Sequence, residues 1–330
     1  MMRQFLLILS MALFFPYVVT LFWTGNTYIV QAAGPDAVME AVKENEAAAV
    51  TASATGKSQR KILLDRGEVH TYMDLESYLE GVLAKQLMFL EGREYRPEAW
   101  KAQAIIARTY LYRIMGDEYE IPESALDIDY LDETDMKKLW EQDRAGVYFE
   151  RIHKAASETK GLVMQIDNAC ILPLFHQVST GVTRKGENIY SYIQSVTCNA
   201  DPLADGYQQS ILIGKEEAAK RISSIADAVP VSASVLPAEI QIIARDEGGY
   251  VARIQIGGKE YSGEQIQAAL GLPSASFAVE DSGTDLRITV KGSGHGYGLS
   301  QNEANAKAGD GWSAEDILVY FYQGINFYNE

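Results

Sequence analysis

The sequence predicts a domain that mixes helices with short antiparallel strands and follows a single membrane-spanning helix. Apolar residues recur at helical spacing after Pro97, and strand-like runs flank turns at residues 167–168 and 257–258. An uncharged apolar run covers residues 5–23. With 330 residues, 47% of them hydrophobic and 22% charged, the chain can bury a core in one large domain or two modest ones.

The amino-terminal run is about as long as the hydrocarbon core of a bilayer requires. Arg3 is the only charge ahead of it, so we expect the leading end to stay cytoplasmic and the bulk of the chain to be extracytoplasmic. We predict a cell-membrane anchor at residues 1–33 and a linker at residues 34–60, where bulky apolar residues are sparse. The alternative is a cleaved signal peptide with small residues at 32–34.

The elements beyond the linker can be placed by their local signals. A strand is expected at residues 62–64, a helix capped by Asp74, and a second helix from Pro97, which suits a first helical position, to about Met115. Residues 116–143 are strongly acidic, and we interpret them as a solvated insertion. A calcium loop is the alternative, but the glycine-centred pattern of alternating oxygens is missing.

The remaining elements alternate between helix and strand. We expect a helix at 149–160, paired strands at 162–164 and 171–175, a helix at 214–225, a strand at 240–243, a hairpin at 251–261, and helices capped by Ser262 and Ser313.

The charge and cysteine content limit the ligands. A formal net charge of −16 argues against a nucleic-acid partner, because binding a phosphate backbone needs a positive field. Any ligand is therefore expected to be held by local hydrogen bonds and by stacking on some of the 19 tyrosines. Cys170 and Cys198 are too few for a disulfide framework, which leaves one bridge, a shared metal or free buried thiols.

Four motifs carry a resemblance to a known family. DLESYLEGVL at residues 74–83, followed by EAWKAQAIIARTY at 98–110, resembles the opening signature of the sporulation protein D family. HQVSTGVT at 176–183, LGLPSASF at 270–277 and GSGHGYGLSQ at 292–301 are similar to later family segments, in the expected order.

The resemblance implies an α+β fold for residues 61–330, in which a smaller region interrupts a core that forms the peptidoglycan cleft. Characterised members of this family are lytic transglycosylases that act on peptidoglycan glycan strands without stem peptides. They cut between muramic acid and glucosamine without water and leave an anhydro end. The expected setting is engulfment during sporulation, and the expected partners are glycan strands and a cell-wall amidase or other sporulation wall proteins.

One departure concerns the catalytic residue. The family's catalytic Glu follows the Gly-Val pair by a few residues, and this position is Gln86 here. A lytic transglycosylase must deliver and then remove a proton, and an amide cannot do this. Either a neighbouring acid, Glu91 or Glu94, has taken over, or the chain is a catalytically inactive protein that binds peptidoglycan or recruits an amidase as a scaffold. The sequence leaves enzyme activity open.

The resemblance also assigns residues to substrate binding. These are Arg108, His176, Ser179, Thr183, His295, Tyr297, Ser300 and Gln301. Alternating glycines around His295 suit a loop whose backbone a ligand must approach closely, and a nucleotide loop would need a Gly-Lys-Ser/Thr ending that is missing. Val182 and Asn302-Glu303 depart from the family pattern.

No cofactor is required for this chemistry. Some family members contain metal, so His176 and Cys198 are candidate zinc ligands. Structural zinc sites usually have four ligands, and the alternative is a hydrogen-bonded cleft histidine without metal.

Overall fold

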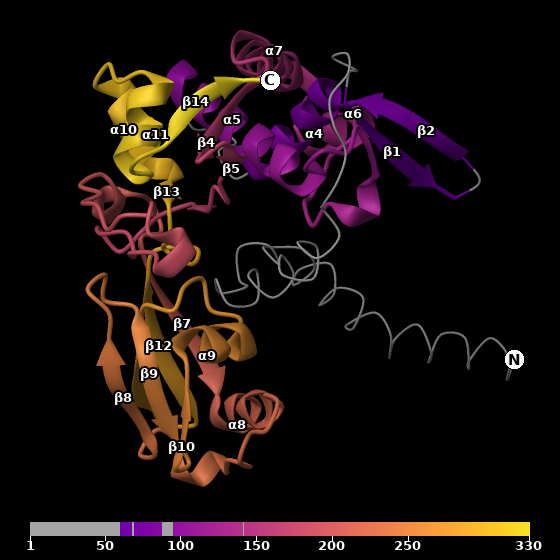
Figure 1. Cartoon of the computed structure of the whole chain (residues 1–330). Coiled ribbons are helices and arrows are strands. Elements are labelled where there is room, and N and C mark those ends of the chain that lie inside the picture. The colour runs from indigo at the N-terminus through magenta and orange to yellow at the C-terminus, as the bar shows by residue number, and fades with distance from the viewer. Residues whose placement is uncertain (1–59, 68, 88–94, 141) are drawn as a thin grey trace, which may run out of the picture.

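The computed structural model describes residues 60–67, 69–87, 95–140 and 142–330. The expected anchor and linker, Glu91 and Glu94 lie outside these residues. Within the described ranges, no helix is long and apolar enough to cross a bilayer. Helices and mainly antiparallel sheets alternate along the chain, as the α+β prediction requires (Figure 1).

A three-stranded sheet and four helices enclose the first hydrophobic core. The strands are β1 (Lys61–Arg66), β2 (Val69–Asp74) and β3 (Glu120–Pro122), with β1 antiparallel to β2 and parallel to β3. The helices are α4 (Leu75–Leu87), α5 (Pro97–Met115), α6 (Glu133–Leu139) and α7 (Gln142–Glu158). Apolar side chains such as Leu79 of α4 and Ile152 of α7 meet in this core.

Helix α5 is buried on most sides because it lies between two cores. Trp100 faces the first core, whereas Ile105 and Ile106 belong to the second. Pro97 occupies the first turn, where its missing N–H leaves no hydrogen bond unmade. The helix ends at Met115, so both of its predicted bounds are confirmed.

The acidic segment contributes to the first core, and its interpretation as a solvated insertion was wrong. Leu126, Met136 and Trp140 are buried, and the ring of Tyr130 stacks on Tyr78 with 4.6 Å between centroids. The acidic residues cover the outer side, and the few apolar residues between them are enough to hold the segment against the core.

The second core gathers elements that lie far apart in the sequence, from α5 to the C-terminal strand. Its sheet joins β4 (Leu162–Ile166) to β5 (Ala169–Cys170) and β14 (Asn326–Asn329). The short strands β6 (Phe175–His176) and β13 (Leu299–Ser300) pair in parallel. Helices α10 (Gln301–Gly309) and α11 (Ala314–Phe321) follow, and Ser313 caps α11 as predicted.

The predicted hairpin around residues 167–168 is only partly confirmed. Asp167 and Asn168 adopt positive φ angles of 51° and 64°, which a tight hairpin turn requires. The ladder ends at Cys170, however, and the following apolar residues run without regular pairing until Phe175. Pro173 lies in this stretch and has no N–H to donate to a ladder.

Residues 208–291 form a smaller region with a core of their own, as expected. One antiparallel sheet contains β7 (Gln208–Gly214), β11 (Phe277–Ser282) and β12 (Asp285–Lys291). The other contains β8 (Ile240–Arg245), β9 (Val251–Ile256) and β10 (Lys259–Tyr261). Helices α8 (Lys215–Ser223) and α9 (Gly263–Leu270) pack with them, and Figure 1 shows the region as a separate lobe in orange. Short 3₁₀ helices occupy Glu123–Ala125, Asn188–Tyr190, Asp201–Leu203 and Ala233–Val235.

Candidate functional site

The pairing of β6 with β13 brings two of the motifs together. Ser300 lies opposite His176 in the parallel register, and Val178 forms an isolated bridge with Ser293. The glycines between these points allow the close approach. Gly294 has a φ of +102°, and a Cβ added to it would lie 2.6 Å from the Cβ of His176. The glycines therefore admit the protein's own backbone and side chains, where the sequence suggested a ligand.

A buried carboxylate, Asp201, fastens the two motifs to each other. One of its oxygens accepts hydrogen bonds from the Ser179 amide and hydroxyl, at 2.7 and 2.6 Å. The other accepts from the Ser300 hydroxyl at 2.9 Å and the Asn302 amide at 3.1 Å. Burial raises the pKa of Asp201, and these hydrogen bonds oppose the shift. Asp201 was not predicted, because it belongs to no motif.

Two histidines lie against each other where residues 176–183 meet residues 292–301, a contact that we call the junction. The rings of His176 and His295 are 5.8 Å apart between centroids. Nδ1 of His176 is 3.1 Å from the Tyr297 carbonyl, and Nδ1 of His295 accepts from the Tyr297 amide at 3.0 Å. Burial lowers the pKa of His176 to about 4. Burial, followed by repulsion from His176 in its protonated form and from Arg184, lowers the pKa of His295 to about 3. Both rings are therefore neutral at pH 7.

Arg184 connects the same junction to the smaller region. It forms ion pairs with Asp246 at 2.6 Å and with Glu264 at 2.5 Å. Its guanidinium also lies over the rings of Tyr297 and Tyr250, at 4.4 and 5.1 Å from their centroids. Tyr297 thus contacts a cation inside the protein and is only partly exposed.

A chain of three glutamines leads from this junction to Gln86. Nε2 of Gln103 donates to Oε1 of Gln86 at 2.8 Å. Nε2 of Gln301 donates to Oε1 of Gln103 at 3.2 Å and approaches the Gln86 carbonyl at 3.4 Å. Tyr95 supports the chain by donating its hydroxyl hydrogen to the Gln301 carbonyl at 3.2 Å. Among the described residues, no carboxylate is hydrogen-bonded to the side chain of Gln86.

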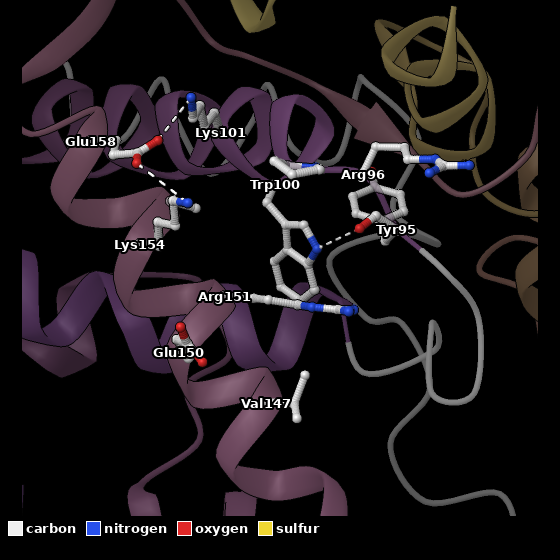
Figure 2. A pocket seen from close by; sticks show the side chains of 11 residues that line it. Tyr95, Arg96, Trp100, Lys101, Val147, Glu150, Arg151, Lys154 and Glu158 are labelled. Atoms are coloured by element: carbon white, nitrogen blue, oxygen red, sulfur yellow. Dashed lines mark hydrogen bonds and ion pairs between the residues drawn. The ribbon is translucent and has the colours of Figure 1, made fainter.

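A hollow of about 440 Å³ lies between the start of α5 and the C-terminal two thirds of α7, and Tyr95, which supports the glutamine chain, is part of its lining (Figure 2). Trp100 and Tyr95 provide its aromatic wall, with the indole N–H donating to the Tyr95 carbonyl at 3.1 Å. Glu158 lies 2.8 Å from Lys101 and raises its pKa. Arg151 makes no hydrogen bond or ion pair with the part of the chain that the structure describes.

Arg108 occupies a different place from the other candidates. It is fully buried in α5, and its forked guanidinium binds both oxygens of Glu76 at 2.7 Å. The remaining donors bind Thr159 and the carbonyls of Ala156 and Leu162. All five donors are used within the protein, so Arg108 holds α4, α5 and the end of α7 together and has none left for a sugar.

The hydroxyl groups of the other predicted substrate-binding residues also form hydrogen bonds within the protein. Those of Ser179 and Ser300 bind Asp201, and that of Thr183 bonds the backbone of Gln194 and Val196. Seven of the eight predicted substrate-binding residues, all except Arg108, thus lie together around the two histidines. Most of their polar groups bind other parts of the protein. The position of Gln103 within the motif at residues 98–110 could have indicated a role in the site. Arg184 lies outside the motifs, so no sequence signal indicated its role.

The zinc assignment does not fit the residues present. No group of three or more His, Cys, Asp or Glu side chains within the described ranges is placed to hold a metal ion. Both cysteines are free thiols, and Cys198 is buried with a raised pKa, which favours the neutral form that binds metal poorly.

Comparison with known proteins supports one family. A family model described as SpoIID, stage II sporulation protein, matches residues 65–165. Two relatives are named stage II sporulation protein D. The protein from Bacillus amyloliquefaciens is 32% identical over 264 residues, and that from Bacillus subtilis is 30% identical over 266 residues. Each alignment covers 76% of this chain and 73% of the relative. An uncharacterized protein from Brachyspira hyodysenteriae is 24% identical over 77% of this chain and 66% of its own length.

Proposed function

Because this chain belongs to the stage II sporulation protein D family, we propose that it serves the sporulating cell wall by holding peptidoglycan glycan strands that carry no stem peptides. The proposed site is the surface around Gln86, where the glutamine chain meets the junction of the two motifs. The strand is held there and is not cut.

The amide environment of Gln86 carries this proposal. Lytic cleavage needs a group that donates a proton to the glycosidic oxygen, and each member of the glutamine chain is an amide that cannot do so. The glutamine chain is nevertheless ordered by hydrogen bonds, and the Tyr95 hydroxyl donates to the backbone carbonyl of Gln301, one of its members. A site whose described residues keep their hydrogen bonds, with an amide at the position of the family's acid, is suited to binding.

The hollow beside Trp100 gives the strand a second place to bind. Its volume lies in the range of small-ligand pockets, and an aromatic wall with neighbouring charged groups suits the faces and hydroxyls of a sugar. In this proposal a neighbouring sugar of the strand occupies the hollow, and Arg151 donates hydrogen bonds to it.

The proposal includes the setting of the protein. Residues 1–33 anchor it in the cell membrane, and residues 61–330 lie outside the cytoplasm, where an amidase supplies stem-free strands. A scaffold that also recruits this amidase is the second candidate function, since residue 86 is an amide where the family has its acid.

Co-sedimentation of the full chain, purified in detergent micelles, with insoluble peptidoglycan tests the proposal. We expect the protein to sediment with amidase-treated peptidoglycan and much less with untreated material. Equal or absent sedimentation with both would exclude a preference for stem-free strands.

A further inference from the structure

We propose that Gln86 binds the glycan as a hydrogen-bond donor, through its amide nitrogen, and that Gln103 fixes this orientation. The recognised group is an acetamido carbonyl oxygen of an N-acetylated sugar. This inference rests on the proposed function, because it specifies how the same site recognises a strand.

The direction of the glutamine chain follows from one backbone atom. The Gln86 carbonyl oxygen can only accept a hydrogen bond, so the side-chain atom of Gln301 that lies 3.4 Å from it is the nitrogen. That nitrogen also faces Gln103, which must therefore turn its oxygen toward Gln301. The nitrogen of Gln103 is then left to face Gln86.

The opposite direction would be less stable. It would bring the side-chain oxygen of Gln301 against the Gln86 carbonyl oxygen, with two acceptors facing each other. The buried Oε1 of Gln301 has no donor among the described residues, and reversing the amide would leave a buried nitrogen without an acceptor there instead. The reversal therefore gains nothing at that end of the chain.

The other end of the chain is the amide nitrogen of Gln86. The side-chain oxygen of Gln86 accepts from Gln103, and the side-chain nitrogen of Gln86 forms no hydrogen bond with the described residues. Gln86 is partly exposed, and its nitrogen is not among the polar atoms that are both buried and without a hydrogen-bond partner. No described residue thus occupies the two N–H donors of Gln86, and we assign them to the ligand.

The chemistry of these donors selects the group that is bound. Amide N–H groups pair well with carbonyl oxygens, and the acetamido carbonyl is the amide acceptor that a stem-free strand repeats along its length. A glutamate at the same position would offer this carbonyl an ionised acceptor at neutral pH, which repels it. Having Gln86 where the family has a glutamate therefore changes what the site recognises and also removes an acid.

Four variants of the full chain in detergent micelles separate these roles. Gln86→Met removes the donors, and Gln86→Glu replaces them with acceptors of the same shape. Gln103→Glu leaves residue 86 unchanged but gives its nitrogen a carboxylate to bind, so that its oxygen turns toward the ligand. Gln208→Glu, at an exposed position of β7, controls for the added charge.

Affinity is measured for amidase-treated glycan strands and for the same strands after removal of their N-acetyl groups. The measurements are made at low temperature, with mass spectrometry to verify that the strands stay intact. We expect Gln86→Met, Gln86→Glu and Gln103→Glu each to lose about tenfold in affinity for N-acetylated strands, equivalent to one hydrogen bond. In a double-mutant comparison, the natural protein should lose affinity when the acetyl groups are removed, and Gln86→Met should not.

The outcomes separate this inference from the proposed function. A natural protein that binds no glycan overturns the proposed function. A natural protein that binds, with Gln86→Met keeping both its affinity and its preference for acetylated strands, overturns only the role of Gln86. Because Gln103 is fully buried, its variant is checked by thermal unfolding, and the two Gln86 variants decide the question if it does not fold.

Discussion

Replacing Asp201 with Asn should destabilise the junction that joins the two central motifs. The carboxylate is fully buried and accepts four hydrogen bonds, two from Ser179, one from Ser300 and one from Asn302. Asn has nearly the same volume but only one acceptor oxygen, and its amide group would face donors on the other side.

The cost can be worked out from these contacts. The Ser179 and Ser300 hydroxyls can rotate toward other acceptors, whereas the Ser179 backbone N–H at 2.7 Å cannot. One or two buried donors are then left unsatisfied at about 1–3 kcal/mol each, so we expect a loss of about 3 kcal/mol in the free energy of unfolding. With a denaturant slope of about 3 kcal/mol per molar urea, the midpoint falls by about 1 M.

Urea unfolding at pH 7, followed by tryptophan fluorescence, measures this loss. Asp205→Asn is the matched control, because Asp205 is exposed and makes no hydrogen bond or ion pair within the described ranges. Its midpoint should stay within about 0.2 M of the natural protein, since exposed substitutions usually change stability by less than about 0.5 kcal/mol. Equal midpoints for both variants would refute the role of Asp201 as the fastening group.

Three further results are expected. Arg108→Lys should lower the free energy of unfolding by about 3 kcal/mol, because lysine cannot reproduce the two-pronged pairing with Glu76, while the folded variant binds glycan as before; weakened binding at unchanged stability would contradict this. Arg151→Ala should lower glycan affinity about fivefold without changing stability, and unchanged affinity would remove the hollow from the proposed site. Acidification from pH 6.5 toward pH 4 should destabilise the fold. Both buried histidines are neutral in the fold and bind protons on unfolding, which contributes about 3 kcal/mol for His176 alone. The raised pKa of Asp201 acts in the opposite direction. Because His176→Gln removes one of the two histidines, its urea midpoint should depend less steeply on pH, and an unchanged dependence would contradict a neutral, buried His176.

Local signals predicted several helix ends, but they missed α6 and α10 and placed the start of α7 at 149, where the structure has Gln142. Pro97 marked the start of α5, and Ser262 and Ser313 both cap helices with reciprocal capping boxes. These positions were predictable because a cap is decided by a few neighbouring residues. The acidic segment was not, because composition alone does not say that Tyr130 stacks on Tyr78.

The site was predicted as a set of motifs but not as a set of contacts. The sequence identified His176 and His295 as parts of one cleft, and the structure places their rings together. It did not indicate that Asp201 fastens the motifs or that Arg184 connects them to the smaller region. Such contacts join residues about 20 to 120 positions apart, and no local periodicity records them.

The central claim is that the strand is held without being cut. The most direct test is digestion of amidase-treated peptidoglycan by the full chain, with anhydromuramyl products followed by mass spectrometry. We predict no products from the natural protein and the first appearance of products in Gln86→Glu. Anhydro products from the natural protein that disappear in Glu91→Gln or Glu94→Gln would contradict the claim, because they would mean that a neighbouring acid cuts the strand.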